Sequence, residues 1–149
     1  MPEKETLKRA RRDKRQGKAP STQAGEFIRE EIHHIREGKH GARSTEQAIA
    51  IGLSKARRAG VKLGRPPASA KAGTRRSAAS ASRAGRHHTR PSPKRSRAVL
   101  RKLKREGRLA ASRKALSRHA KSAARARSAA SRRASAKRAA RTRRRRANA

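Results

Sequence analysis

Residues 21–63 read STQAGEFIREEIHHIREGKHGARSTEQAIAIGLSKARRAGVKL and contain most of the chain's large apolar side chains. In the first part of this stretch the apolar residues recur at three- and four-residue steps, which is the spacing of one helix face. We therefore expect an amphipathic helix that begins at Ser21 or Thr22 and runs to about Glu37, with Gly38 as its stop.

A second helix is expected in the same stretch. Ser44 and Gln47 fit a capping box, in which Ser44 accepts from the Gln47 amide and the Gln47 side chain reaches back. Farther along, Gly52 would let another helix approach closely. The short connection between the two helices predicts an antiparallel αα-hairpin. Its expected packing residues are Phe27, Ile28, Ile32, Ile35, Ile49 and Leu53.

The hairpin has little apolar surface to bury. At about 25 cal/mol per Å² its few large side chains contribute less free energy than ordering some 40 residues costs. Val61 and Leu63 are expected to fold back over its open end. A homodimer or a protein partner is expected to complete the packing.

Large apolar residues are scarce in the chain as a whole. Its 149 residues include 46 Lys and Arg against 9 Asp and Glu, for a formal charge of +37, and only 15 Leu, Ile, Val and Phe. So much charge with so few large apolar residues is typical of disordered proteins. The sequence therefore predicts a mostly α-helical chain with extensive disorder and no large core.

We expect four regions along the chain. Residues 1–20 form a basic N-terminal arm with a short exposed helix, and residues 21–63 form the helical hairpin. Residues 64–92 are rich in Ala, Ser, Arg, Gly and Pro and form a disordered basic linker. Residues 93–149 form a long basic Ala/Arg/Ser tail, in which a short helix begins at Pro93 and ends at Gly107. The rest of this tail is expected to be disordered alone and helical when a polyanion neutralises it.

The charge of the second half predicts a nucleic-acid partner. Residues 65–149 hold 30 basic residues and one acidic residue. Duplex DNA carries one negative charge per about 1.7 Å, so these cations could match about 30 phosphates. We expect largely sequence-independent binding of double-stranded DNA, driven by counterion release. The expected contact residues are Arg65, Lys94, Arg95, Arg97, Arg101, Lys102, Lys104, Arg105, Arg132, Arg133, Lys137, Arg138, Arg141, Arg143, Arg144, Arg145 and Arg146.

Two short motifs agree with this interpretation. Gly64-Arg65-Pro66 matches the centre of an AT-hook, although Leu63 stands where that motif has Arg, and Ser92-Pro93-Lys94-Arg95 resembles the repeats of linker-histone tails. A linker and a helix start are the alternative interpretations of the two motifs. Aromatic residues, on which single strands and specific RNA sites stack, are nearly absent, so duplex DNA is favoured while RNA stays an alternative.

Enzymatic, metal-binding and membrane-binding functions are not expected. The chain lacks Cys, and we expect no cofactor and no metal. Glu30 and Glu31 are interpreted as a solvated face, and a chain with so little core is not expected to hold a catalytic constellation. Six histidines lack a recognised ligand spacing and are interpreted as solvated: His33, His34, His40, His87, His88 and His119.

No apolar run is long enough for a secretory signal or a membrane span, and the tail lacks the large apolar residues of a membrane-surface helix. We therefore expect a soluble cytoplasmic protein that associates with the nucleoid.

Residues 21–63 also resemble small basic bacterial proteins known as plasmid stabilisation proteins, through the segments STQAGEFIREEIHHIREGKHGARS and QAIAIGLSKARRAG. The resemblance implies a bacterial source and a role in DNA maintenance or as an antitoxin-like partner. The tail looks like those of linker histones and protamines. The sequence thus predicts a nucleoid-associated or plasmid-maintenance accessory protein, and the alternatives are an antitoxin-like protein-binding module and an RNA- or ribosome-associated factor.

Overall fold

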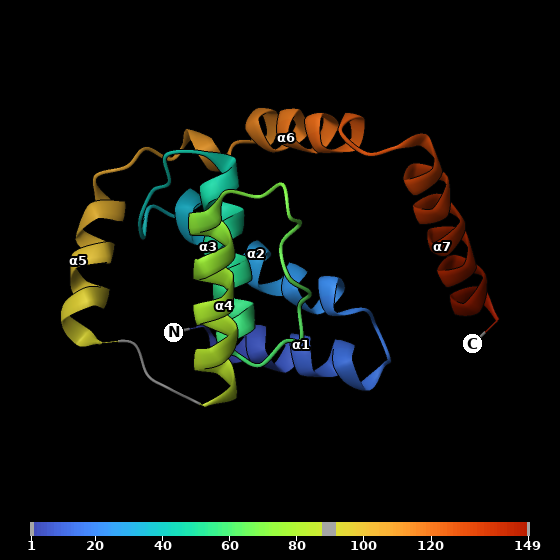
Figure 1. Ribbon diagram of the computed structural model, residues 1–149, viewed down its shortest axis with the longest axis horizontal. Coiled ribbons are helices and arrows are strands. Elements are labelled where there is room, and N and C mark those ends of the chain that lie inside the picture. The colour runs from blue at the N-terminus through green and yellow to red at the C-terminus, as the bar shows by residue number, and fades with distance from the viewer. Residues whose placement is uncertain (1, 88–91, 149) are drawn as a thin grey trace. The chain divides into compact units, whose positions relative to one another are not determined.

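The computed structural model describes residues 2–87 and 92–148, apart from the side chain of Arg146 (Figure 1). Within these residues the protein is helical and no strand occurs, so the expected mostly α-helical class is confirmed. The extensive disorder expected with it was wrong, because helices form along most of the described chain. The elements are α1 (Lys4–Arg15), α2 (Pro20–Arg36), α3 (Thr45–Arg58), α4 (Ala72–Arg86), α5 (Pro93–Lys104), the short 3-10 helix η1 (Leu109–Ala111), α6 (Arg113–Arg125) and α7 (Ala129–Ala147). They form two compact units, Met1–Ser112 and Arg113–Ala149.

The expected hairpin is present as α2 and α3. Ser44 caps α3 by accepting from the Gln47 amide at 3.2 Å, and the Gln47 side chain reaches back to accept from the Arg43 amide at 2.9 Å. Gly38 follows α2 with a φ of 77°, a conformation that glycine adopts without strain. The expected start of α2 was wrong by a residue or two, because Pro20 occupies the first turn and Ala19 precedes it without a side-chain cap.

The core is smaller and richer in alanine than the apolar stripe predicted. Phe27 and Ile35 are fully buried and Ile32 nearly so. Ile28, Ile49 and Leu53 are only partly covered. Phe27 packs in a cluster with three alanines, and the partly buried hydrophobic residues against this cluster are Leu7, Leu53, Val61 and Leu63. The fold-back of Val61 and Leu63 is thus confirmed.

Helix α1 is the short helix expected near the N-terminus, but it packs in the folded unit, so its expected exposure was wrong. Thr6 and Ala10 are buried against α2, and Leu7 reaches the core cluster. An ion pair of 2.6 Å between Arg9 and Glu26 joins the two helices at their surface. The sequence did not predict this contact, because α1 has only one large apolar residue and packs through a face of small side chains.

Helix α4 replaces much of the expected disordered linker and lies alongside α3 (Figure 1). Its Ala81 and Gly85 are buried, and a Cβ on Gly85 would overlap the Arg57 carbonyl oxygen. Small residues thus let the two backbones nearly touch. Residues 88–91 of that expected linker, His88 among them, lie outside the described residues.

The α2–α3 loop is joined to the end of α5 and to the segment that follows it. The Gly41 amide donates to the Leu103 carbonyl at 2.9 Å, and the Ala42 amide donates to the Gly107 carbonyl at 3.0 Å. A Cβ on Gly41 would overlap the Glu106 carbonyl. The Thr45 hydroxyl donates to the Ala110 carbonyl at 2.7 Å. We call these contacts the loop clamp. Helix α5 begins at Pro93 as expected but ends at Lys104, before Gly107.

The second unit contains α6 and α7, where disorder was expected. Ser128 caps α7 by accepting from the Ser131 amide at 3.2 Å. Alanine and arginine have high helix propensity, which explains helices that have almost no buried surface of their own. Among the described residues, no helix combines the length and apolar character that crossing a membrane requires.

A Gly52→Val substitution tests the close approach of α2 and α3. A Cβ at Gly52 would lie 2.7 Å from the Ile28 Cα, so a branched side chain must push the helices apart. We expect a loss of about 1–3 kcal/mol in the free energy of unfolding, measured by urea titration. The control is Gly25→Ala in α2, where a Cβ meets no atom within 4 Å. It should stabilise by about 0.5–1 kcal/mol, and equal effects of the two variants would contradict the packing.

Candidate functional site

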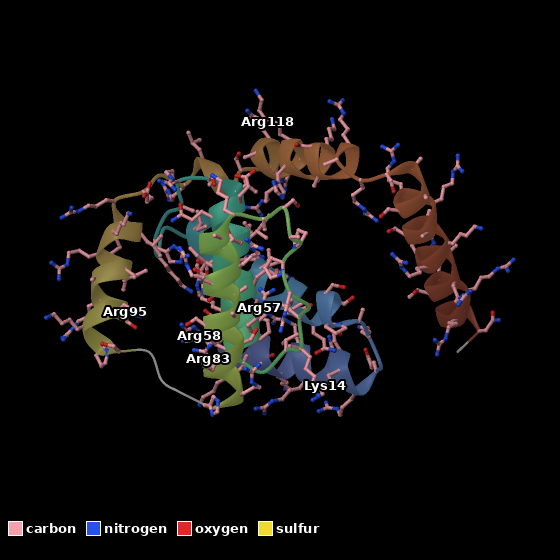
Figure 2. The ribbon with its side chains drawn as sticks, viewed as in Figure 1. Lys14, Arg57, Arg58, Arg83, Arg95 and Arg118 are labelled. Carbon is pink, nitrogen blue, oxygen red and sulfur yellow. The ribbon has the colours of Figure 1, made fainter. Side chains whose placement is uncertain are left out.

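The expected DNA contacts of the first unit are all accessible. Arg65 is exposed, and so is every basic residue predicted on or next to α5: Lys94, Arg95, Arg97, Arg101, Lys102, Lys104 and Arg105. Figure 2 shows the basic side chains of α5 projecting from the helix. Ser92 and Pro93 lie at the start of this helix, so the helix-start interpretation of the Ser-Pro-Lys-Arg motif is confirmed.

In the second unit the predicted contacts lie on α7. The exposed residues are Arg132, Arg133, Lys137, Arg138, Arg141, Arg143, Arg144 and Arg145. The side chain of Arg146 lies outside the described residues. The spacing of these basic residues along α7 distributes them around the helix rather than on one face. Such a helix presents positive charge in every direction.

Sequence reasoning missed four exposed cations on α4, because it assigned that segment to a linker: Arg75, Arg76, Arg83 and Arg86. Ala81 and Gly85 face α3, so the arginines occupy the rest of the α4 surface. A signal for this helix was present in the small residues Ala78, Ala81 and Gly85, which recur at three- and four-residue steps.

Arg57 has a structural role instead of a surface one. It is 9% exposed and donates to the Gly64 carbonyl at 3.0 Å. This bond holds the chain where it leaves the hairpin, next to the Gly64-Arg65-Pro66 motif. Its neighbour Arg58 is exposed. Figure 2 shows both side chains beside α4.

A buried charge cluster lies between α2 and α3. Glu30 and Glu31 are 4% and 0% exposed, so their interpretation as a solvated face was wrong. The Lys55 ammonium lies 3.1 Å from Glu30 Oε1 and 2.6 Å from Glu31 Oε2. Helix neighbours diverge by about 100°, yet the long Lys55 side chain spans the gap between these two carboxylates.

The environment of Glu30 favours its charged form. Burial by itself raises the pKa of this carboxyl group, but hydrogen bonds from the Glu3 amide and from Thr6, together with Lys55, lower the pKa below its ordinary value. The Glu3 amide donates to Glu30 Oε2 at 3.0 Å. Glu30 therefore joins the start of α1 to α2 and, through Lys55, to α3.

Two histidines are part of the same region. His40 is 9% exposed, and its Nε2 lies 3.2 Å from Glu31 Oε1. The side chain of His34 is 13% exposed, and its Nε2 lies 2.8 Å from Glu3 Oε1. The interpretation of these two residues as solvated was wrong. His33 and His87 are exposed as expected, and His119 is half-buried.

A pocket of about 220 Å³ opens beside this cluster. It is lined by Glu3, Thr6, Arg9, Arg29, Glu30, His33, His34, Glu37 and Lys39. On its rim the Lys39 ammonium contacts Glu3 at 3.2 Å and Glu37 at 3.0 Å. Hydrogen bonds to His34 and Lys39 lower the pKa of the Glu3 carboxyl group. The pocket is therefore polar, with carboxylates and cations in mutual contact.

No family model, curated protein or solved structure matches this chain.

A Lys55→Met substitution tests the buried cluster. It leaves two buried carboxylates without their shared cation, so we expect a loss of about 3–5 kcal/mol in the free energy of unfolding, measured by chemical denaturation. Lys39→Met removes an exposed ammonium that also contacts two carboxylates. This control should change stability by about 1 kcal/mol or less. A Lys55 variant as stable as the control would show that the cluster does not hold the helices together.

Proposed function

We propose that this protein binds double-stranded DNA without catalysis and largely without sequence preference, through contacts between Lys or Arg side chains and phosphates. The observation that carries the proposal is the set of exposed cations on α4, α5 and α7, in a chain whose only acidic residue after Glu46 is Glu106. Folding of these segments leaves their charge accessible instead of neutralising it.

The physical basis is counterion release. Each phosphate that a cation neutralises frees condensed ions, so affinity rises with the number of contacts and falls steeply with salt. Arginine also donates bidentate hydrogen bonds to phosphate and suits a narrow minor groove. These contacts position the protein on a duplex and carry little sequence information.

Both units take part in the proposed binding. The sequence placed most contacts in the tail, whereas the structure adds the exposed arginines of α4 to those of α5 in the first unit. Two cationic units in one chain would let the protein occupy neighbouring duplex segments and bridge them. This property suits a nucleoid-associated or plasmid-maintenance accessory protein.

Burial of the hairpin core argues against the antitoxin-like alternative. Phe27, Ile32 and Ile35 are buried by packing within the chain, so only the partly covered Ile28, Ile49 and Leu53 of the expected apolar stripe stay accessible to a protein partner. The resemblance of residues 21–63 to plasmid stabilisation proteins stays a prediction, and it agrees with DNA maintenance. RNA is the alternative polyanion, and the binding experiment distinguishes it from DNA.

The proposal is tested by titrating the full-length chain into a labelled 30-base-pair duplex over a salt series, with fluorescence anisotropy as the readout. Three triple variants remove equal charge: Arg141, Arg144 and Arg145 to Gln on α7; Arg75, Arg76 and Arg83 to Gln on α4; and Arg11, Arg12 and Arg15 to Gln on α1 as the control. The slope of log K against log salt should fall by up to about 3 for the α7 and α4 variants.

The α1 control should change that slope by less than about 1, because these arginines are not among the proposed contacts. An unchanged slope in the α7 variant would show that the tail mechanism is wrong. Preference of about tenfold or more for one duplex sequence over a scrambled one would contradict sequence-independent binding. Tighter binding of a structured RNA than of the duplex would assign the protein to the RNA-binding class.

A further inference from the structure

Three side chains that the proposed DNA binding does not use converge beside α2. Glu31 and His34 lie three positions apart on α2, and His40 lies in the loop that follows. One potential ligand atom from each lies within 4.8 Å of the other two. Glu and His at this i, i+3 spacing on one helix face are a recurring way for helical proteins to hold a metal ion.

The geometry at His40 suits a metal ligand. Its Nδ1 lies 3.0 Å from the Gly41 carbonyl oxygen, which can only accept, so Nδ1 carries the proton. In the neutral ring the lone pair is then on Nε2, and Nε2 faces Glu31 Oε1 at 3.2 Å. Two ligands of a tetrahedral zinc ion, each about 2.0–2.1 Å from it, lie roughly 3.3 Å apart.

The buried carboxylate of Glu31 is the second indication of a metal site. Its carboxylate is 0% exposed, and within the described part of the chain neither oxygen has a hydrogen-bond partner. Lys55 and His40 lie at ion-pair distance from it but without hydrogen-bond alignment. A buried carboxylate costs free energy unless its oxygens are satisfied, and a cation bound at Oε1 would satisfy one of them.

His34 completes the set. The Glu3 carboxylate accepts from its Nε2 and so selects the ring tautomer with its lone pair on Nδ1, as carboxylates do for histidines that bind metals. His34 also lines the pocket, which gives an ion a route from solvent. The ion-paired network around these histidines contains four carboxylates (Glu3, Glu30, Glu31 and Glu37) and two ammonium groups, Lys39 and Lys55. Arg9 and Arg29 also line the pocket, so groups of both charges surround the site.

We propose that Glu31, His34 and His40 bind a divalent transition-metal ion, with Zn²⁺ as the best match to two imidazoles and one carboxylate. Three protein ligands of this type leave one position of a tetrahedral zinc ion for water. Mg²⁺ and Ca²⁺ prefer oxygen ligands and should not compete. Closure of the site needs the His34 ring to move toward the other two ligands. Bound metal would attach the α2–α3 loop to α2 and stabilise the first unit.

The test is a Zn²⁺ titration of the full-length protein, prepared without a polyhistidine tag, with the thermal unfolding midpoint as one readout and the visible spectrum with Co²⁺ as the other. We expect a metal-dependent rise of the midpoint and the intense bands of tetrahedral Co²⁺, whereas Mg²⁺ should produce neither effect. His40→Gln and His34→Gln should weaken binding by about 100-fold, on the scale at which even outer carboxylates cost 10–100-fold. His87→Gln is the matched control, because His87 is exposed and distant from the site in sequence.

Glu3→Ala keeps the test decisive if a histidine variant does not fold. The Glu3 side chain is exposed and contacts His34 and Lys39, while the backbone amide that donates to Glu30 stays in the variant. Loss of this side chain should therefore leave a folded protein whose Zn²⁺ affinity is about tenfold lower. No midpoint shift with Zn²⁺, or an equal shift in wild type, His40→Gln and His34→Gln, would overturn the proposal. Binding that only His87→Gln abolishes would also overturn it. None of these readouts depends on DNA binding, so the two proposals can fail separately.

Discussion

The contact of Lys55 with the two buried carboxylates of α2 holds the first unit together. Acidic residues are rare in this chain, and nearly all of them lie before residue 47, where Glu26, Glu30 and Glu31 join α1, α2 and α3. Mutual repulsion among 46 basic residues opposes any compact state. Glu30 and Glu31 counter part of this repulsion, because they are buried between helices and share the Lys55 ammonium.

Close approach of helix backbones supplies packing contacts that the few large apolar side chains of this chain cannot supply. Within the part of the chain that the structure describes, the fully buried core includes only two large aliphatic or aromatic side chains, Phe27 and Ile35. Gly52 lets the α3 backbone meet α2, and Gly85 lets the α4 backbone meet α3. Contacts between backbones gain dispersion energy, and they cost little side-chain entropy because few side-chain rotamers are fixed. A count of Leu, Ile, Val and Phe therefore underestimates how much of such a chain can fold.

The sequence predicted those parts of the fold that have local signals. Spacing of apolar residues located α2 and α3, and the Ser44 cap and Gly38 stop were recognisable from residue type. Helix α4 was missed because small residues at helical spacing indicate packing only when a partner backbone is known. The tail was expected to be disordered because charge repulsion was given more weight than the helix propensity of alanine and arginine.

The residues of the candidate sites also divide into those that the sequence predicted and those that it did not. Exposure of the cationic contacts followed from charge alone, since Lys and Arg are rarely buried without a partner. Burial of Glu30, Glu31 and His40 could not be predicted, because the groups that surround them come from α1, from α3 and from the loop after α2. Nothing in the local sequence distinguishes these carboxylates from the exposed Glu37. Tertiary contacts decide which charged residues of a helix become buried in an ion-paired network.

The loop clamp has a consequence for the order of folding. Its side-chain bond from Thr45 reaches a carbonyl that lies 65 positions farther along the chain. Contacts of such long range form slowly, whereas α1, α2 and α3 are neighbours in sequence and can associate early. During synthesis the hairpin emerges from the ribosome well before residues 103–111, so the clamp closes last. Closure of the clamp therefore attaches the cationic α5 to helices that have already packed.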